Sequence, residues 1–80
     1  MDFSTIGFLR ADRYRLRILE ATKSKVAKKQ ISGRLRIPQA LVDKTLKELQ
    51  GRDLVKEDED SFLITDKGMK VLAQISRQHA

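Results

Sequence analysis

The side chains best suited to chemistry in this sequence lie between residues 39 and 48, and they are polar groups that can donate and accept hydrogen bonds. If Val42, Leu46 and Leu49 form the buried face of a helix, the polar residues between them face outward. Glutamine can pair with the edge of adenine, lysine with guanine or phosphate, and aspartate with the cytosine amino group. The alternative is an ordinary solvated helix face. The candidate contact residues here are Gln39, Ala40, Asp43, Lys44 and Lys47.

A second group of candidates lies on or just after the preceding predicted helix. These are basic side chains, which suit phosphate contacts that position a protein on nucleic acid without distinguishing its sequence. Because the group adjoins the proposed contact helix, we favour phosphate binding over a purely solvated face. The group consists of Lys28, Lys29, Arg34 and Arg36.

Other chemistries have little support in the residue pattern. His79 is the single histidine and stands next to the last residue, where a metal or catalytic role is improbable. The acidic run 57–60 lacks the alternating ligands and central glycine of a calcium loop. No pairing of nucleophile and base and no glycine-rich phosphate loop is evident. We therefore expect no enzyme activity, no metal and no cofactor.

Charge is distributed unevenly along the chain. The net charge is +6, from 17 Lys or Arg and 11 Asp or Glu. Residues 1–36 carry ten of the basic and three of the acidic side chains, whereas residues 37–80 carry seven and eight. A basic half suits a polyanionic partner, because Lys and Arg displace counterions from phosphates; the alternative is that charge serves only solubility.

Length and composition bound the class of protein. Eighty residues allow one small domain, residues 1–80, with a thin core. There is no cysteine, and no apolar run approaches the roughly 20 residues that span a bilayer. The N-terminus lacks the features of a signal peptide. We expect a cytoplasmic protein with no membrane partner.

The first elements follow from capping and periodicity. Asp12 can cap a first helix that runs to about Thr22. Residues 13–18 alternate apolar and polar side chains as a strand does, but the apolar pattern continues through Leu19 and Ala21, which favours a helix. A polar connection, which can end in a short strand near residue 26, leads to a second helix with Ala27, Ile31 and Leu35 on one face.

The remaining elements are delimited by turn and capping residues. Pro38 begins a third helix over residues 38–50, with Gly51 as its expected C-cap. Two short apolar runs at 54–56 and 62–64 flank a polar turn, which predicts a hairpin. Thr65 is a suitable N-cap for a last helix.

The order of these motifs resembles that of a known family. The run from Gln30 to Leu49 is similar to the helix-turn-helix of winged helix-turn-helix transcription regulators, and residues 62–68 resemble their strand-to-helix element. Residues 13–21 resemble the first helix of small archaeal-type and MarR-like members. The resemblance implies a mainly α fold with a small β-hairpin wing, ordered helix, short strand, two helices, hairpin, helix. It also implies a transcription regulator that places helix 38–50 in the major groove of double-stranded DNA.

Two departures from the family pattern keep other functions open. Arg36 stands in the turn where many members have glycine, so we expect a strained backbone there. The expected wing tip, residues 57–60, is acidic and would repel phosphate, so it must stay clear of bound DNA. The alternatives are a winged-helix module that binds another protein and a binder that tolerates any nucleic-acid sequence, for chromatin or RNA.

Apolar residues outside the predicted core faces suggest self-association. A thin core combined with these residues predicts a homodimer through the N-terminal segment and the terminal helices. In a dimer, two contact helices would stand about 34 Å apart, to match successive major grooves. The apolar residues concerned are Phe3, Ile6, Phe8, Leu16 and Leu63.

Overall fold

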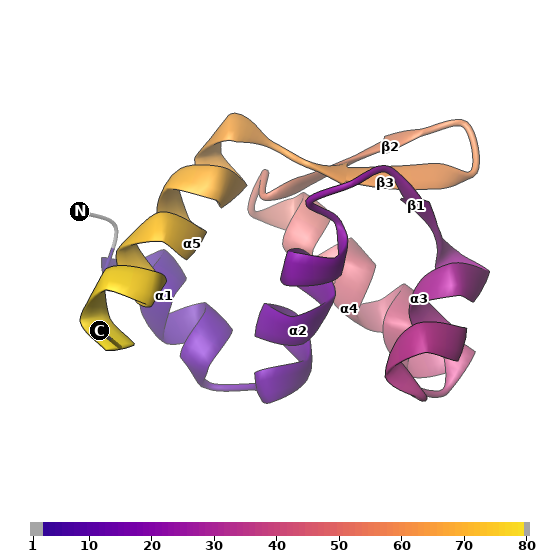
Figure 1. Cartoon of the computed structure of the whole chain (residues 1–80), viewed down its shortest axis with the longest axis horizontal. Coiled ribbons are helices and arrows are strands. Elements are labelled where there is room, and N and C mark those ends of the chain that lie inside the picture. The colour runs from indigo at the N-terminus through magenta and orange to yellow at the C-terminus, as the bar shows by residue number, and fades with distance from the viewer. Residues whose placement is uncertain (1–2, 80) are drawn as a thin grey trace.

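The computed structural model describes residues 3–79 as helices packed around a small antiparallel sheet (Figure 1). Each of the predicted elements is present, and one further helix precedes them. The strands are β1 (Val26–Ala27), β2 (Val55–Asp58) and β3 (Ser61–Ile64). The helices are α1 (Phe3–Arg10), α2 (Arg13–Ala21), α3 (Lys28–Leu35), α4 (Gln39–Gly51) and α5 (Asp66–His79).

Helix α2 begins and ends where its local signals predict. The Asp12 carboxylate accepts a hydrogen bond of 2.9 Å from the Tyr14 backbone amide, which satisfies one of the free donors of the first turn. At the other end, the buried Thr22 hydroxyl donates to the Leu19 carbonyl at 2.7 Å. The strand-like alternation of residues 13–18 is therefore overruled by capping and by burial of Ile18 and Leu19.

The turn between α3 and α4 is held by two hydrogen bonds between the same residues. The Ile37 amide donates to the Ser32 carbonyl at 3.2 Å, and the Ser32 hydroxyl donates to the Ile37 carbonyl at 2.6 Å. Arg36 adopts the left-handed conformation expected for it, with φ 55° and ψ 46°. Pro38 directly precedes α4, which confirms the helix predicted over 38–50 with each end shifted by one residue.

The C-cap predicted at Gly51 is wrong. Gly51 is still helical, Arg52 is the cap, and the left-handed conformation occurs at Asp53, with φ 62°. The Leu54 amide then returns to the Leu49 carbonyl at 3.0 Å, which closes the end of α4. Gly51 therefore predicted the end of α4 to within two residues. It did not identify Asp53 as the residue that takes the left-handed conformation.

The sheet has the order β1-β3-β2, and all of its strand pairs are antiparallel. In its register, Val26 pairs with Phe62 and Val55 pairs with Ile64. These four side chains are buried and face the helices, and so they extend the core beneath the hairpin. The short strand suggested near residue 26 is thereby confirmed.

Helix α1 was not predicted. Ile6 is 5% exposed and Leu9 is fully buried, and α1 packs against α2 and α5. Three of the residues expected to serve self-association, Ile6, Phe8 and Leu16, are instead in the core or packed against it. Phe3, at 72% exposed, is the apolar residue of α1 that lies open to solvent.

The start of α5 is packed tightly against the sheet. The Thr65 hydroxyl accepts a hydrogen bond from the Gly68 amide at 3.0 Å, which confirms its predicted capping role, and donates to the Asp53 carbonyl at 2.7 Å. Gly68 is buried, and a Cβ atom there would meet the Leu54 carbonyl oxygen at 2.5 Å and Ile64 Cγ1 at 2.6 Å. The missing side chain therefore allows α5 to approach the β2–β3 hairpin.

We expect Gly68→Ala to lower the free energy of unfolding by about 1–3 kcal/mol, because the added methyl group overpacks a rigid backbone contact. Gly33→Ala is the matched control: it lies within α3 and has open space around its Cβ position. Removing glycine from a helix interior there should raise stability by up to about 1 kcal/mol. Urea denaturation of both variants measures the difference, and equal stability of the two would contradict the packing argument.

Candidate nucleic-acid interface

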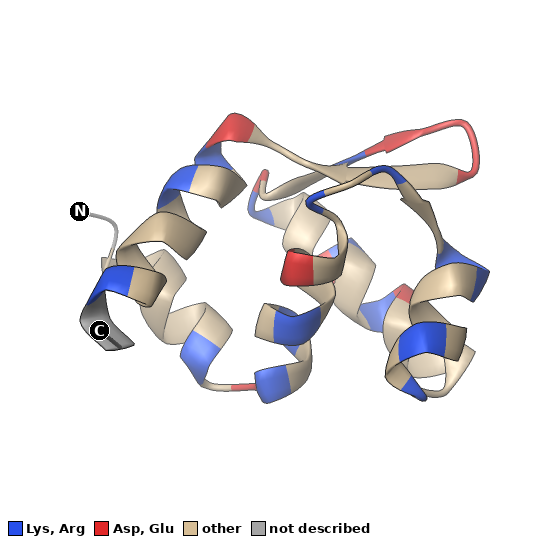
Figure 2. Cartoon of the chain, viewed as in Figure 1, with Lys and Arg blue, Asp and Glu red and all other residues tan. Residues whose placement is uncertain are grey.

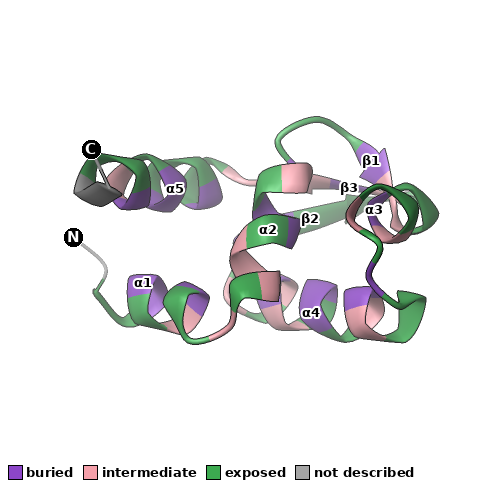
Figure 3. Ribbon diagram, turned by 60° about the horizontal axis from the view of Figure 1, so that its bottom comes forward, coloured by how far each residue is buried: buried purple, intermediate pink, exposed green. Residues whose placement is uncertain are grey.

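The outward face of α4 carries most of the predicted contact residues. Because Val42, Leu46 and Leu49 are buried, the opposite side of the helix is left to solvent (Figure 3). Asp43 is half-buried, and Glu48, which the same pattern places outward, is half-buried and forms an ion pair with Arg15. The exposed members of the predicted set on α4 are Gln39, Ala40, Lys44 and Lys47.

The basic residues predicted to bind phosphate flank this face. Lys29 and Arg34 are exposed on α3, and Arg36 is exposed in the turn that joins α3 to α4. Figure 2 shows basic segments along both helices of this end of the molecule. The turn joins the two helices that carry the predicted groups. We refer to these predicted residues together as the α3–α4 face: Lys28, Lys29, Arg34, Arg36, Gln39, Ala40, Asp43, Lys44 and Lys47.

Two lysines of the α3–α4 face are paired with one carboxylate. Lys28 Nζ lies 2.7 Å from Asp43 Oδ1, and Lys47 Nζ lies 3.3 Å from Asp43 Oδ2. The hydrogen bond from Lys28, followed by that from Lys47, lowers the pKa of Asp43 below its ordinary value. The same hydrogen bond raises the pKa of Lys28, and the nearby carboxylates Glu57 and Asp60 raise it further.

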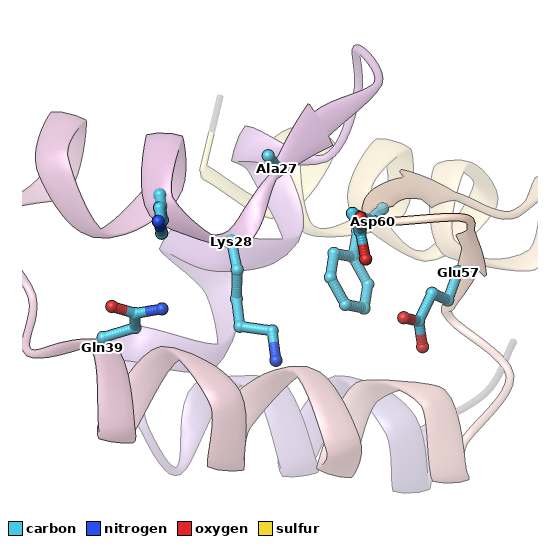
Figure 4. A pocket seen from close by; sticks show the side chains of 7 residues that line it. Ala27, Lys28, Gln39, Glu57 and Asp60 are labelled. Carbon is cyan, nitrogen blue, oxygen red and sulfur yellow. The ribbon is translucent and has the colours of Figure 1, made fainter.

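A groove runs between the hairpin and the N-terminal ends of α3 and α4 (Figure 4). Lys28 extends into it from α3 toward α4, and Glu57 and Asp60 come from the hairpin on the other side. Two carboxylates of the hairpin therefore lie beside Lys28 and Lys29, at the edge of the α3–α4 face. The residues lining the groove are Ala27, Lys28, Lys29, Gln39, Glu57, Asp60 and Phe62.

A comparison with models of known protein families gives independent support for this order of helices and hairpin. The sequence model of a family described as winged helix-turn-helix matches residues 14–80. The chain belongs to this winged helix-turn-helix family. Searches of curated proteins and of solved structures gave no significant match. In winged-helix terms, α3 and α4 are the helix-turn-helix and the β2–β3 hairpin is the wing, an arrangement that suits DNA binding.

The wing of this winged helix-turn-helix is acidic at its tip but partly neutralised. Lys25 Nζ lies 2.9 Å from Asp58 Oδ2, and this hydrogen bond lowers the pKa of Asp58. Glu59 takes a left-handed conformation, with φ 57°, in the turn between β2 and β3. Lys25 therefore neutralises part of the acidic wing, while Glu57 and Asp60 line the groove together with Lys28 and Lys29.

One arginine of the basic N-terminal half serves the fold of the winged helix-turn-helix. Arg15 donates hydrogen bonds to the Phe8 carbonyl at 2.9 Å and to Glu48 at 3.0 Å. Its guanidinium also lies 4.0 Å from the centroid of the Phe8 ring, and that of Arg52 lies 4.2 Å from the same centroid. The sequence alone did not indicate this cluster, because its members are separated by up to 44 positions.

None of the helices in the described part of the chain has the length and apolar character needed to span a membrane.

We expect Arg36→Gly to raise the free energy of unfolding by about 1 kcal/mol, because glycine adopts the left-handed conformation of the turn without a Cβ penalty. Arg34→Gly is the matched control: the same replacement within α3 should lower stability by about the same amount. Urea denaturation compares the two variants. Destabilisation by both would show that the Arg36 side chain contributes more than its backbone strain costs.

We expect the Asp43 carboxyl group to titrate below the ordinary aspartate value of about 3.9, and Lys28→Met to move the midpoint upward. A depressed folded-state pKa adds stability that is present above the unfolded-state pKa and is lost as the pH falls through the folded-state value. Carboxyl carbon shifts measured by NMR against pH give the midpoint. As a control, Lys25→Met should shift Asp58 but leave Asp43 unchanged; an unchanged Asp43 midpoint in Lys28→Met would contradict the ion pair in solution.

Proposed function

We propose that this chain binds double-stranded DNA by placing α4 in the major groove, and that it regulates transcription in the cytoplasm as a single domain. The observation that carries the proposal is the exposed, polar outer face of α4 flanked by cations from α3 and the turn. A helix-turn-helix requires this arrangement, in which one helix projects from its support. The family match supports the DNA-binding part.

The proposal gives different roles to different parts of the α3–α4 face. Lys29, Arg34 and Arg36 contact phosphates and fix the register of the protein on the duplex. Gln39 and Lys44 contact base edges near the start and middle of α4, and the small side chain of Ala40 suits contact with a thymine methyl group. Lys28, Asp43 and Lys47 are engaged with one another in the free protein, so their contacts depend on breaking those ion pairs.

A homodimer is part of the proposal. Phe3 is 72% exposed on α1 and Met69 is 47% exposed on α5, and these two helices lie at the end of the molecule opposite α3 (Figure 1). Pairing through this end would leave both α3–α4 faces free for two half-sites. Sedimentation at several protein concentrations tests this part separately, and a monomer throughout would remove it from the proposal.

The acidic wing favours a second candidate function, in which the domain binds another protein instead of DNA. Glu57 and Asp60 place carboxylates in the groove beside the α3–α4 face, where a phosphate chain would be repelled. A basic segment of a partner protein would be attracted by the same charges. The two functions differ in their response to duplex DNA, which makes one titration sufficient to separate them.

We expect amide chemical shifts to change mainly over residues 28–47 when random duplex DNA is added at low salt, and the changes to weaken at moderate salt. Lys29→Gln should lower the affinity and reduce the slope of log K against log salt by about 0.9, the value for one phosphate contact. Lys70→Gln, an exposed site on α5, is the matched control and should leave the slope unchanged.

The same titration discriminates among the alternatives. Tighter binding of a selected operator than of random DNA supports a regulator, whereas equal binding of every duplex supports a sequence-tolerant binder. An absence of shifts at low salt would overturn DNA binding and favour the protein partner.

A further inference from the structure

Asp43 occupies an unusual place for an acidic residue, in the middle of the α3–α4 face. Both of its carboxylate oxygens are used: Oδ1 accepts from Lys28 at 2.7 Å and Oδ2 is paired with Lys47 at 3.3 Å. The carboxylate thus links the start of α3 to the outer side of α4. Two of the cations expected to bind phosphate are therefore held by an internal anion in the free protein.

These ion pairs contribute little to folding. The side chains of Lys28 and Asp43 are 37% and 36% exposed and that of Lys47 is 74% exposed, and pairs at such exposure stabilise proteins only weakly because water and salt screen them. The core residues of α4 already fix its position without them. The arrangement therefore matters more for the charge of the surface than for the stability of the fold.

The ion pairs compete directly with phosphate contacts. A lysine that moves to a phosphate must leave Asp43, and the uncovered carboxylate then faces a polyanion. Both effects oppose binding that depends on phosphates alone, and phosphate contacts supply nearly all of the affinity for DNA of arbitrary sequence. Contacts with base edges by Gln39 and Lys44 do not require this exchange.

We propose that Asp43 suppresses binding to DNA of arbitrary sequence by holding Lys28 and Lys47 away from phosphates. Asp43 is then a specificity-determining residue that acts through the two lysines. This inference rests on the proposed DNA-binding function. It adds that the binding surface itself limits the affinity for DNA of arbitrary sequence. The wing carboxylates Glu57 and Asp60 line the same groove as Lys28, and their charges also attract it away from phosphates.

The test is the affinity of Asp43→Asn for a random duplex, measured by fluorescence anisotropy between about 50 and about 200 mM salt. Asparagine keeps the shape of the aspartate side chain but removes its negative charge. We expect binding at the lower salt to tighten roughly threefold to tenfold, and the slope of log K against log salt to steepen by up to about 1.8, because up to two lysines gain phosphate contacts. Glu20→Gln is the matched control, since it removes one negative charge from α2, which carries none of the α3–α4 face.

A double-mutant cycle separates release of the lysines from a general change in charge. In a Lys28→Gln, Lys47→Gln background, Asp43→Asn should give a smaller gain in affinity than in the parent and no steepening of the salt slope, since only the repulsion by the carboxylate is removed and the two lysines are absent. Amide spectra of each variant establish that the fold is retained. An equal gain in both backgrounds would overturn the inference, because the effect would then not pass through Lys28 and Lys47.

The possible failures are distinguishable. If the parent protein binds random DNA and Asp43→Asn binds no tighter than Glu20→Gln, the inference is wrong while the proposed function stands. If neither the parent nor Asp43→Asn binds any duplex at low salt, the proposed function is wrong and the inference fails with it.

Discussion

The turn between α3 and α4 is the constraint on which the functional surface depends. Ser32 and Ile37 close the turn through two hydrogen bonds, and the buried Ile37 side chain ties it to the core. The left-handed conformation of Arg36 changes the chain direction within this closure, at a backbone cost that the bonds and the burial offset. Once α4 leaves the turn in this direction, burial of Val42 and Leu46 against the core leaves the opposite face of α4 to solvent.

Local signals were sufficient for the elements whose ends are capped by their own side chains. Asp12 and Thr65 cap the helices that follow them, and Pro38 marks the start of α4 within one residue. Helix α1 has no comparable signal, and Gly7 disfavours it as an isolated segment. It is stabilised by tertiary contacts instead, through burial of Ile6 and Leu9, and such contacts have no short-range pattern in the sequence.

The candidate site shows the same division between local and distant information. Periodicity along α4 correctly placed Val42, Leu46 and Leu49 in the core, but Asp43 and Glu48, which it placed outward, are half-buried. The pairing of Lys28 with Asp43 joins residues 15 positions apart on different helices, so it follows from the crossing of α3 and α4 and not from either segment alone. Sequence reasoning could list the charged residues of the face, but it could not show which of them neutralise one another.

The distribution of charge in the sequence therefore overstates the number of cations available to a polyanion. Arg15 is committed to Phe8 and Glu48, Lys25 to the wing, and Lys28 to Asp43, although all three contribute to the basic N-terminal half. The exposed cations that remain on α3 and in the turn are a smaller set, Lys29, Arg34 and Arg36. Because the same turn that exposes α4 also brings Lys28 onto Asp43, the geometry that creates the surface also limits its attraction for phosphate. A change of turn geometry would alter that balance without any change in net charge, so the electrostatic behaviour of this domain depends on its fold as well as its composition.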